Sequence, residues 1–371
     1  MPKSYHQLHD LKVLLGQLAP KSVMVFCGKQ SYQNSLYRAP FEDCLKDYAV
    51  RYFSDYQANP NAEDIERAQQ TLQQCQPDLV IAIGGGSVMD TAKLARFFAA
   101  QSFSPTEARP TNIVAPRSQL VCIPTTSGTG SESTQFATYY IGHTKHSLDH
   151  ENCLPNTKIL DVRCVENLPK ALAVTTGLDS LCHALESLWA RGATVSSQTK
   201  ALTALRTILQ NFVPRIEQPN ARNSLAMLEA ASLAGEAIQI SRTTAAHAIS
   251  YPLTSIYKLP HGLAAAMTIR QLLAFNTPAL DLSLQQRVCN ALKLRDFSQL
   301  DEQLAHIFTR LKVKTSLRQC GIDPTQARTH ILPHVSEQRL VNNPRPLSAD
   351  NIIALLENSP TTHAIEEGSY S

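Results

Sequence analysis

One stretch of the chain limits its fold more than any other: a continuous apolar run that leads directly into a glycine-rich turn. The run covers residues 78–83 (DLVIAI), and GGGS follows at residues 84–87. An apolar run of this length without alternation is typical of a parallel strand that is buried on both faces. A helical pattern comes next, with Ser87 as the expected N-cap residue and Asp90 at a capping-box spacing. The stretch therefore predicts a strand–turn–helix unit within a parallel sheet.

The first part of the chain repeats this alternation of strand and helix signals. A helix-like segment at residues 62–75 precedes the apolar run, and short β-rich segments lie on both sides of it. Further strands are expected at residues 22–27, 51–53, 119–123 and 157–161. Alternation of this kind predicts an α/β fold with a parallel sheet, which we assign to a domain at residues 1–165.

The texture of the sequence changes after about residue 165, where long segments rich in Ala, Leu, Glu and Gln begin. Their apolar residues are spaced as on helices, and the alternation typical of strands is absent. Helices are expected at residues 168–190, 196–212, 223–240, 264–275, 282–291 and 300–311. We therefore predict a second, all-helical domain at residues 166–371, with a frayed tail from about residue 360.

Length and composition exclude several classes of protein. At 371 residues the chain is longer than one core normally organises, which agrees with two domains. A formal net charge of +3 is too small to indicate nucleic-acid binding, and no apolar run could span a bilayer. Nine cysteines are scattered without a CxxC pair or a secretory signal. We therefore expect reduced thiols in a cytoplasmic protein that binds neither membranes nor nucleic acid, and we expect a homodimer.

The helical half contains one carboxylate and three imidazoles in apolar surroundings. Asp179 and His183 are four residues apart in a helical run, so both side chains leave the same face. His247 and His261 follow later, among Ala, Ile, Leu and Pro. Such a donor set suits Zn or Fe(II) better than Ca or Mg. The spacing also fits a helix ion pair and hydrogen-bonded core histidines, so the residues alone leave both interpretations open.

Two loops follow predicted strands at the same edge of the sheet. The GGGS turn precedes a helix whose first N–H groups and positive dipole end could bind a phosphate. The loop at residues 125–132 (TTSGTGSE) is rich in hydroxyls and small residues. Together they predict a nucleotide-binding crevice, although each loop taken alone is also an ordinary tight turn or solvated connection.

Four segments of the chain resemble the iron-dependent (group III) alcohol dehydrogenases. They read GGGSVMDTAK, PTTSGTGSE, TTGLDSLCHALE and HAISYPLTSIYKLPHG, in the order and at the spacing of that family. The resemblance extends from about residue 21 to about residue 356. It implies an N-terminal dinucleotide-binding domain, a C-terminal helical domain, an NAD(P)H cofactor, and a metal that is Fe(II) or sometimes Zn.

The resemblance also implies roles for individual residues. Those implied to contact the cofactor are Gly28, Gly85, Gly86, Ser87, Asp90, Lys93, Thr125, Thr126 and Thr129. Those implied to hold the metal are Asp179, His183, His247 and His261.

The chain departs from the family's pattern at two positions. Many NAD-specific members carry an Asp after the first strand, where it accepts hydrogen bonds from the adenosine ribose; here Gly28 stands there, followed by Lys29 and Ser31. This change would tolerate a 2′-phosphate, so we lean to NADPH, although Lys29 is equally well an exposed turn residue. Many members also have a His four residues after the third ligand, where this chain has Tyr251, which could still pass a proton.

A finer resemblance is to the phosphonoacetaldehyde reductases, also called hydroxyethylphosphonate dehydrogenases. The segments SRTTAAHAISYPLTS, KHSLDHENCLP and NNPR carry it. The implied substrate is an aldehyde with a phosphonate group, which needs cationic or N–H partners. Basic residues that could supply them are Arg242, Lys145, Lys258, Arg270 and Arg345, and we favour Arg242 as a catalytic residue because it lies shortly before His247.

The combined interpretation is a metal-dependent NAD(P)H oxidoreductase that reduces phosphonoacetaldehyde to 2-hydroxyethylphosphonate. One alternative is a general iron-type alcohol dehydrogenase that acts on another small aldehyde. A second, of a different class, is a lyase similar to dehydroquinate synthase, which also uses NAD and a metal. A third is a nucleotide-binding protein without catalytic activity.

Overall fold

The computed structural model describes residues 1–107, 112–142 and 144–357. By the contacts within each part, the chain forms two compact units, Met1–Arg242 and Thr243–Ser371. The domain boundary that we place after residue 165 is drawn from sequence texture and stays a prediction. The fraying expected from about residue 360 lies outside the described residues.

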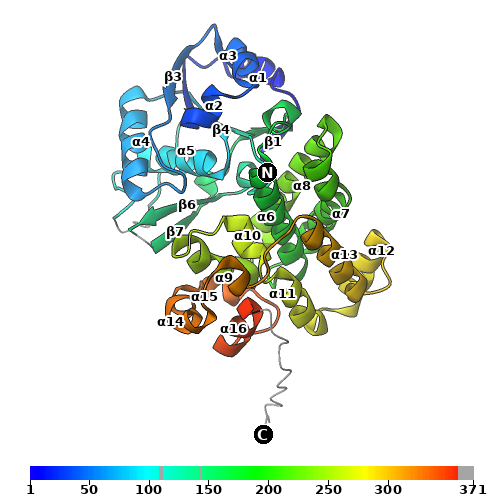
Figure 1. The fold of residues 1–371 in the computed structure, drawn as a ribbon. Helices are drawn as coiled ribbons and strands as arrows, with labels where there is room; N and C mark the ends of the chain where they lie inside the picture. The colour runs from blue at the N-terminus through cyan, green and yellow to red at the C-terminus, as the bar shows by residue number, and fades with distance from the viewer. Residues whose placement is uncertain (108–111, 143, 358–371) are drawn as a thin grey trace. The chain divides into compact units, whose positions relative to one another are not determined.

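The first unit is built on a six-stranded sheet in which all neighbouring strands are parallel (Figure 1). The strand order across the sheet is β1-β8-β5-β4-β2-β3. In chain order the strands are β1 (Lys3–Tyr5), β2 (Ser22–Cys27), β3 (Ala49–Phe53), β4 (Leu79–Gly84), β5 (Gln119–Pro124) and β8 (Thr157–Ile159). The predicted α/β fold with a parallel N-terminal sheet is confirmed, and β1 is the strand that the sequence pattern did not indicate.

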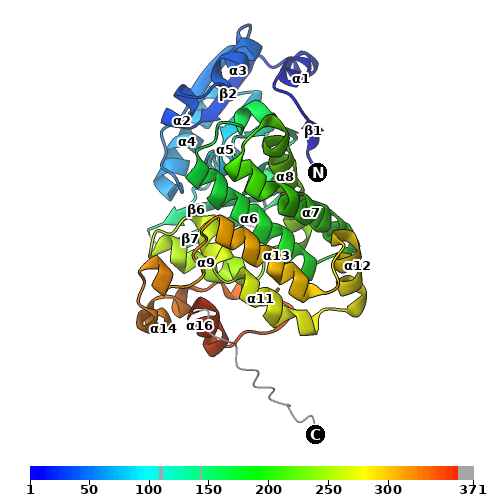
Figure 2. The same ribbon diagram turned by 45° about the vertical axis from the view of Figure 1, so that its right-hand side comes forward.

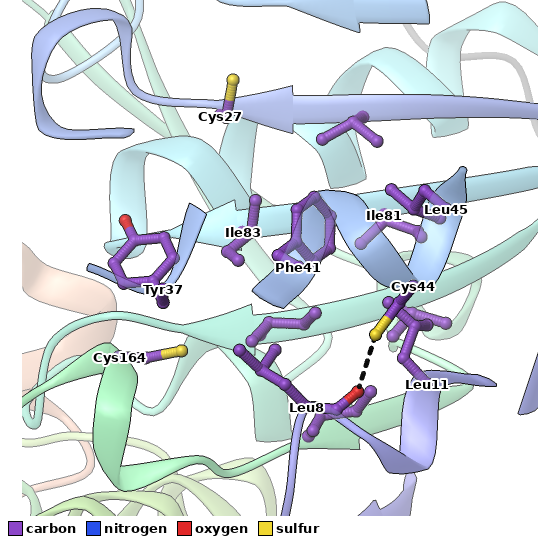
Figure 3. Packing of buried hydrophobic residues seen from close by; sticks show 14 of the residues in the cluster. Leu8, Leu11, Cys27, Tyr37, Phe41, Cys44, Leu45, Ile81, Ile83 and Cys164 are labelled. Carbon is purple, nitrogen blue, oxygen red and sulfur yellow. Dashed lines mark hydrogen bonds between the residues drawn. The ribbon is translucent and has the colours of Figure 1, made fainter. Parts of the chain in front are cut away.

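The apolar residues of β4 alternate between two cores, one on each face of the sheet. Val80 and Ala82 lie in a cluster that contains residues of α4 and α5. Ile81 and Ile83 lie in a second cluster with residues of α1 and α3, among them Phe41 (Figure 3). The helices on this sheet are α1 (Asp10–Leu18), α2 (Lys29–Gln33), α3 (Arg38–Leu45), α4 (Ala62–Cys75) and α5 (Gly86–Ala99). Burial on both faces explains why this strand reads as an uninterrupted apolar run.

An antiparallel hairpin and three short 3-10 turns complete the connections of the first unit. The hairpin pairs β6 (Phe136–Ile141) with β7 (Thr144–Asp149). The turns are η1 (Ser131–Ser133), η2 (Glu151–Cys153) and η3 (Val162–Cys164). The hairpin was not predicted from the sequence, because β7 (TKHSLD) is mostly polar and shows no continuous apolar run.

Three long helices of the first unit, α6, α7 and α8, pack side by side (Figure 2). They are α6 (Lys170–Trp189), α7 (Val195–Glu217) and α8 (Ala221–Ser241), close to the predicted segments. Thr194 and Asn220 each begin the following helix with a capping box, in which the side chain accepts a hydrogen bond from the third residue on. These caps explain the sharp starts of α7 and α8.

The described residues of the second unit form helices and the loops between them, with no strand among them. Its helices are α9 (Ala245–Ser255), α10 (His261–Ala266), α11 (Ile269–Asn276), α12 (Leu282–Leu292), α13 (Phe297–Arg310), α14 (Ala327–His330), α15 (Glu337–Leu340) and α16 (Ala349–Glu357). Its 3-10 turns are η4 (Thr277–Ala279), η5 (Arg318–Cys320), η6 (Pro324–Gln326) and η7 (Leu332–His334). The single helix predicted at 264–275 is instead α10 and α11, and α9 was not predicted because Pro252 interrupts its pattern.

Two expectations about the class of protein can be compared with the structure. All nine cysteines lie in the described ranges, and each is a free thiol, as expected. None of the described helices combines the length and the apolar composition that crossing a bilayer requires.

Candidate cofactor loops and metal ligands

The glycine-rich turn after β4 leads into helix α5, whose N-terminus has no side-chain cap. Gly85 is the N-cap residue of α5, in an extended conformation, and no side chain caps the helix. The prediction that Ser87 is the N-cap was wrong. Ser87 lies inside the first turn of α5, where its hydroxyl accepts a hydrogen bond from the backbone N–H of Asn59 at 3.2 Å. A bare cap leaves the positive end of α5 open to an anion.

This turn lies directly against the hydroxyl-rich loop that follows β5. A Cβ atom added at Gly86 would come within 2.8 Å of the Thr129 methyl carbon, which is closer than real Cβ contacts. The backbone N–H of Thr125 donates to the Gly84 carbonyl at 3.0 Å and joins the start of the second loop to the end of β4. The two predicted cofactor loops therefore meet at one edge of the sheet.

The second loop has a buried polar atom without a hydrogen bond. Within the part of the chain that the structure describes, the buried hydroxyl of Thr126 has no hydrogen-bond partner. Farther along, Gly130 has a φ of 61°, and a Cβ there would lie 2.5 Å from the Cα of Gly235 in α8. An unsatisfied hydroxyl costs free energy unless a ligand completes it, so this loop fits a polar cofactor.

Asp90 and Lys93 project from α5 toward Ser131, near the end of the second loop, and toward the residues that follow this loop. One carboxylate oxygen of Asp90 accepts from the Ser131 hydroxyl at 2.7 Å, and the other accepts from the N–H and the hydroxyl of Thr138, each at 3.0 Å. The ammonium of Lys93, whose side chain is fully buried, donates to the same Ser131 hydroxyl at 2.7 Å. Both side chains thus contact protein groups, and their predicted contact with the cofactor stays a prediction.

The turn after β2 is the position where the family often carries an acid. Gly28 is the extended N-cap residue of the short helix α2, whose residues 29–33 include no carboxylate. The Lys29 side chain is exposed. Beside the turn, the Tyr56 hydroxyl donates to the Cys27 carbonyl at 2.7 Å, and burial raises the pKa of the Cys27 thiol to about 11. The turn itself therefore carries a lysine and no acid, and the charges that act on the neighbouring Cys27 are those of the Arg38–Glu42 ion pair.

Asp179 and His183 occupy one face of α6, and both side chains are buried. A carboxylate oxygen of Asp179 lies 3.6 Å from the Nε2 atom of His183, which is longer than a hydrogen bond. Two ligand atoms held about 2.1 Å from one tetrahedral ion would lie about 3.4 Å apart. The pair therefore has the spacing of two ligands of a single metal.

The other two predicted ligands lie in the second unit. His247 is buried in α9, and His261 is the first residue of α10. Their ring centroids are 5.4 Å apart and the planes are inclined by 66°. Two imidazoles on one tetrahedral ion would have centroids about 5 Å apart, so this pair also fits. The Tyr251 ring of α9 stacks beside His261, with centroids 6.4 Å apart.

The basic residues considered for the phosphonate have protein partners. The Arg242 guanidinium lies 3.1 Å from a carboxylate oxygen of Asp149 and 4.4 Å from the centre of the Phe136 ring. Arg270 pairs with both carboxylate oxygens of Asp301, and Arg345 donates to the Phe275 carbonyl. Lys258 donates to the Ser255 carbonyl, and Lys145 lies half-buried on β7. Which of them binds an anion stays a prediction.

A buried charged cluster near the second loop was not predicted from the sequence. Lys158 lies on β8 with only 2% of its side chain exposed, and its ammonium pairs with Glu236 of α8 at 2.7 Å. Lys200 of α7 contacts the other oxygen of Glu236. Burial also raises the pKa of the nearby Glu132 carboxyl. The lysine at the second position of the predicted strand TKILD was a signal that could have indicated this cluster, because lysines are rarely buried without a partner.

Comparison with known proteins gives one consistent family. The model of the iron-containing alcohol dehydrogenases matches residues 4–162, and that of the C-terminal part of the Fe-containing alcohol dehydrogenase family matches residues 173–360. A phosphonoacetaldehyde reductase from Streptomyces viridochromogenes is 31% identical over 77% of this chain and 77% of its own. The probable alcohol dehydrogenase EutG of Escherichia coli is 29% identical over 80% and 76%.

A solved structure agrees at the level of the fold. The sulfoacetaldehyde reductase from Bifidobacterium kashiwanohense, crystallised with NAD+, superposes with a TM-score of 0.87 over 97% of both chains, at 23% identity. The arrangement of sheet and helices in this chain is therefore one that known enzymes of this type share.

Proposed function

Because the chain belongs to the iron-containing alcohol dehydrogenase family, we propose that it reduces phosphonoacetaldehyde to 2-hydroxyethylphosphonate with NAD(P)H. Its relatives are alcohol dehydrogenases and aldehyde reductases, so the chain is an oxidoreductase of small aldehydes or alcohols. The observation that carries the finer proposal is the 31% identity to a phosphonoacetaldehyde reductase over three quarters of both chains. Another small aldehyde is the alternative substrate.

We propose Asp179, His183, His247 and His261 as the ligands of one divalent metal, Fe(II) or Zn. Two observations support this, the 3.6 Å spacing within the first pair and the 5.4 Å spacing within the second. Such an ion, when bound, polarises a carbonyl oxygen as a Lewis acid. The buried carboxylate supplies the negative charge, and the imidazoles bind as neutral ligands, which limits the cost of burying charge.

The loops at the sheet edge would bind the dinucleotide. Gly85, Gly86 and Ser87 offer backbone N–H groups at the start of α5 to the phosphates, and the orphaned hydroxyl of Thr126 supports a polar ligand beside them. Thr125 and Thr129 belong to the same loop. With Lys29 and no carboxylate after Gly28, this site would accept a 2′-phosphate, so we propose a preference for NADPH.

Reduction also needs a proton for the product oxygen. Tyr251 stacks beside His261 and carries the hydroxyl that we propose as the proton donor. Arg242 is our candidate for the phosphonate, which would have to compete with Asp149 for the guanidinium. We further propose a cytoplasmic homodimer.

The leading test is metal analysis of anaerobically purified protein, followed by a screen of NADH and NADPH oxidation with several aldehydes. We expect about one ion per chain and the highest kcat/KM with phosphonoacetaldehyde. A cyclase would regenerate its NAD and show no net change in cofactor absorbance. Metal-loaded protein that binds NADPH but reduces no aldehyde would contradict the proposal and favour a non-catalytic nucleotide-binding protein.

A paired substrate test addresses Arg242. If its guanidinium binds the phosphonate, Arg242→Ala should lower kcat/KM for phosphonoacetaldehyde by about 100-fold and that for propanal by much less, because a charge-assisted hydrogen bond is lost only with the dianion. Equal losses with both aldehydes would instead assign the residue a structural role through Asp149 and Phe136.

A further inference from the structure

Two buried lysines hold the two serines of η1, Ser131 and Ser133, at the end of the second cofactor loop. We propose that Lys93 and Lys158 are positioning residues, which fix the loop at residues 125–130 in the shape that binds the dinucleotide. The inference rests on the proposed cofactor site, and it assigns these lysines a role that does not require contact with the cofactor.

Lys93 holds the loop from the side of α5. Its ammonium donates to the Ser131 hydroxyl at 2.7 Å and to the Phe136 carbonyl at 3.0 Å. The Ser131 hydroxyl in turn donates to Asp90 at 2.7 Å, so one serine bridges a cation and an anion of the same helix. Charge-assisted hydrogen bonds in a buried site are strong and directional, and they leave this serine little freedom.

Lys158 holds the loop from the side of β8. Its ammonium donates to Ser133 at 2.9 Å, to Ser232 at 2.8 Å and to Glu236 at 2.7 Å. A buried ammonium is tolerated because Glu236 balances its charge and all three contacts point to acceptors. Ser133 is thereby tied to both β8 and α8.

The residues of α5 proposed to bind the phosphates and those that hold Ser131 lie on the same face of the helix. Gly86, Asp90 and Lys93 are spaced at i, i+4 and i+7, so they lie along one face of the helix. Thr129 of the second loop lies so close to Gly86 that a Cβ there would be 2.8 Å from its methyl carbon, and Asp90 and Lys93 form hydrogen bonds with Ser131 of the same loop. The distance between the two cofactor loops is therefore set by a single rigid helix.

The backbone between Ser131 and the proposed cofactor-binding residue Thr129 is short and closely packed. Ser131 follows Gly130, which lies in a left-handed conformation against the backbone of Gly235. The Ser131 N–H also donates to the Thr129 hydroxyl at 3.3 Å. A displacement of Ser131 is consequently passed to Thr129, which faces Gly86. Loss of the hydrogen bonds to Ser131 should therefore weaken cofactor binding more than it slows the chemical step.

The test compares Ser131→Ala, Lys93→Met and Lys158→Met with the matched control Lys200→Met. Lys200 pairs with the same Glu236 but is not among the groups that hold Ser131 or Ser133. The dissociation constants of NADH and NADPH are measured by cofactor fluorescence, together with kcat, KM and thermal unfolding. We expect the three variants to raise the cofactor Kd and KM about tenfold with kcat little changed, as for a site loosened without loss of a reacting group. Lys200→Met should leave the Kd within about twofold of the parent.

Three outcomes would overturn the inference. One is an unchanged cofactor Kd in folded Ser131→Ala and Lys158→Met proteins. Another is a rise in Lys200→Met as large as in Lys158→Met, which would indicate general destabilisation. If the lysine variants do not fold, the cofactor Kd of Ser131→Ala alone tests the inference, because this variant keeps every charge.

The third outcome is a parent protein that binds neither NADH nor NADPH, which would refute the proposed function and this inference together. A parent protein that binds NADPH but reduces no aldehyde would refute only the proposed function.

Discussion

The sheet edge of the first unit and the histidine-bearing helices of the second hold their proposed ligands in different ways. At the sheet edge the decisive groups are backbone atoms and small side chains, as at Gly86, where a Cβ would press on Thr129. In α9 and α10 the decisive groups are the imidazoles of His247 and His261, which belong to separate helices. Cofactor binding at the sheet edge should therefore be weakened by substitutions that add side-chain atoms. Metal binding at the helices should be weakened by substitutions that remove an imidazole.

The difference teaches which substitutions separate the two functions. A dinucleotide is bound by many weak contacts along a surface, so it demands close approach of the backbone. A metal is bound by a few strong donors, so each donor matters individually. Four substitutions test whether the two regions hold their ligands in these two different ways.

The largest effect is expected from His261→Ala. Loss of one donor should reduce metal content to background and lower kcat/KM by at least about 1000-fold, since the proposed Lewis acid is lost with the metal. The Kd for NADPH should stay within about twofold, because the sheet edge is untouched. Metal is measured by elemental analysis, with His306→Ala, an exposed histidine of α13, as control. Retained metal with lost cofactor binding would contradict the assignment.

The reverse pattern is expected from Gly86→Ala. The new Cβ would lie 2.8 Å from the Thr129 methyl carbon, so the two loops must separate and the NADPH Kd should rise about 100-fold. Metal content should be unchanged. Adding Thr129→Ser removes that methyl carbon and should restore part of the affinity. No recovery in the double variant, or loss of metal in the single one, would count against the proposed contact between the loops.

A smaller and more selective effect is expected from Gly28→Asp. A carboxylate there can accept hydrogen bonds from a ribose and repel a 2′-phosphate, so the ratio of kcat/KM for NADH over NADPH should rise about tenfold. The Cβ would lie 2.1 Å from the Ser31 hydroxyl, the end of a side chain that can rotate away. Gly28→Asn has nearly the same size without the charge and should leave the ratio nearly unchanged. An equal response of both variants would remove the electrostatic argument.

The smallest effect is expected from Glu236→Gln. This change weakens the ion pair with Lys158, the lysine that holds Ser133. Burial by itself would raise the pKa of Glu236, but hydrogen bonds from Lys158 and Lys200 outweigh it, and the net pKa is lowered from 4.5. The stabilisation from a lowered pKa is complete above 4.5 and is lost as the pH falls through the folded-state pKa. At pH 7 the variant should unfold about 2–4 °C below the parent.

That difference in unfolding temperature should shrink as the pH is lowered below 4.5, because the parent then loses the same ion pairs. Thermal unfolding followed by circular dichroism at pH 7, 5 and 4 measures it. A constant difference at all three values would show that Glu236 acts by packing and not by charge.

Much of the fold follows from patterns that are local in the sequence. The run at 78–83 predicts β4 because a strand buried on both faces has no polar side, and the helical spacing after residue 165 predicts α6, α7 and α8. The capping of α5 was predicted wrongly, since the pattern around Ser87 and Asp90 resembles a capping box. In the structure Asp90 instead accepts hydrogen bonds from Ser131 and Thr138.

The sequence by itself determined the class of sheet, the helical character of the second half and the residues offered as metal and cofactor ligands, because each depends on residue type and short spacing. Only the tertiary structure decided how those residues are supported. Lys158 and Glu236 are 78 residues apart, and the burial of their pair depends on β8 and α8 packing together. No short-range pattern encodes such a contact, because its stability comes from excluding water from two charges that meet only in the folded chain.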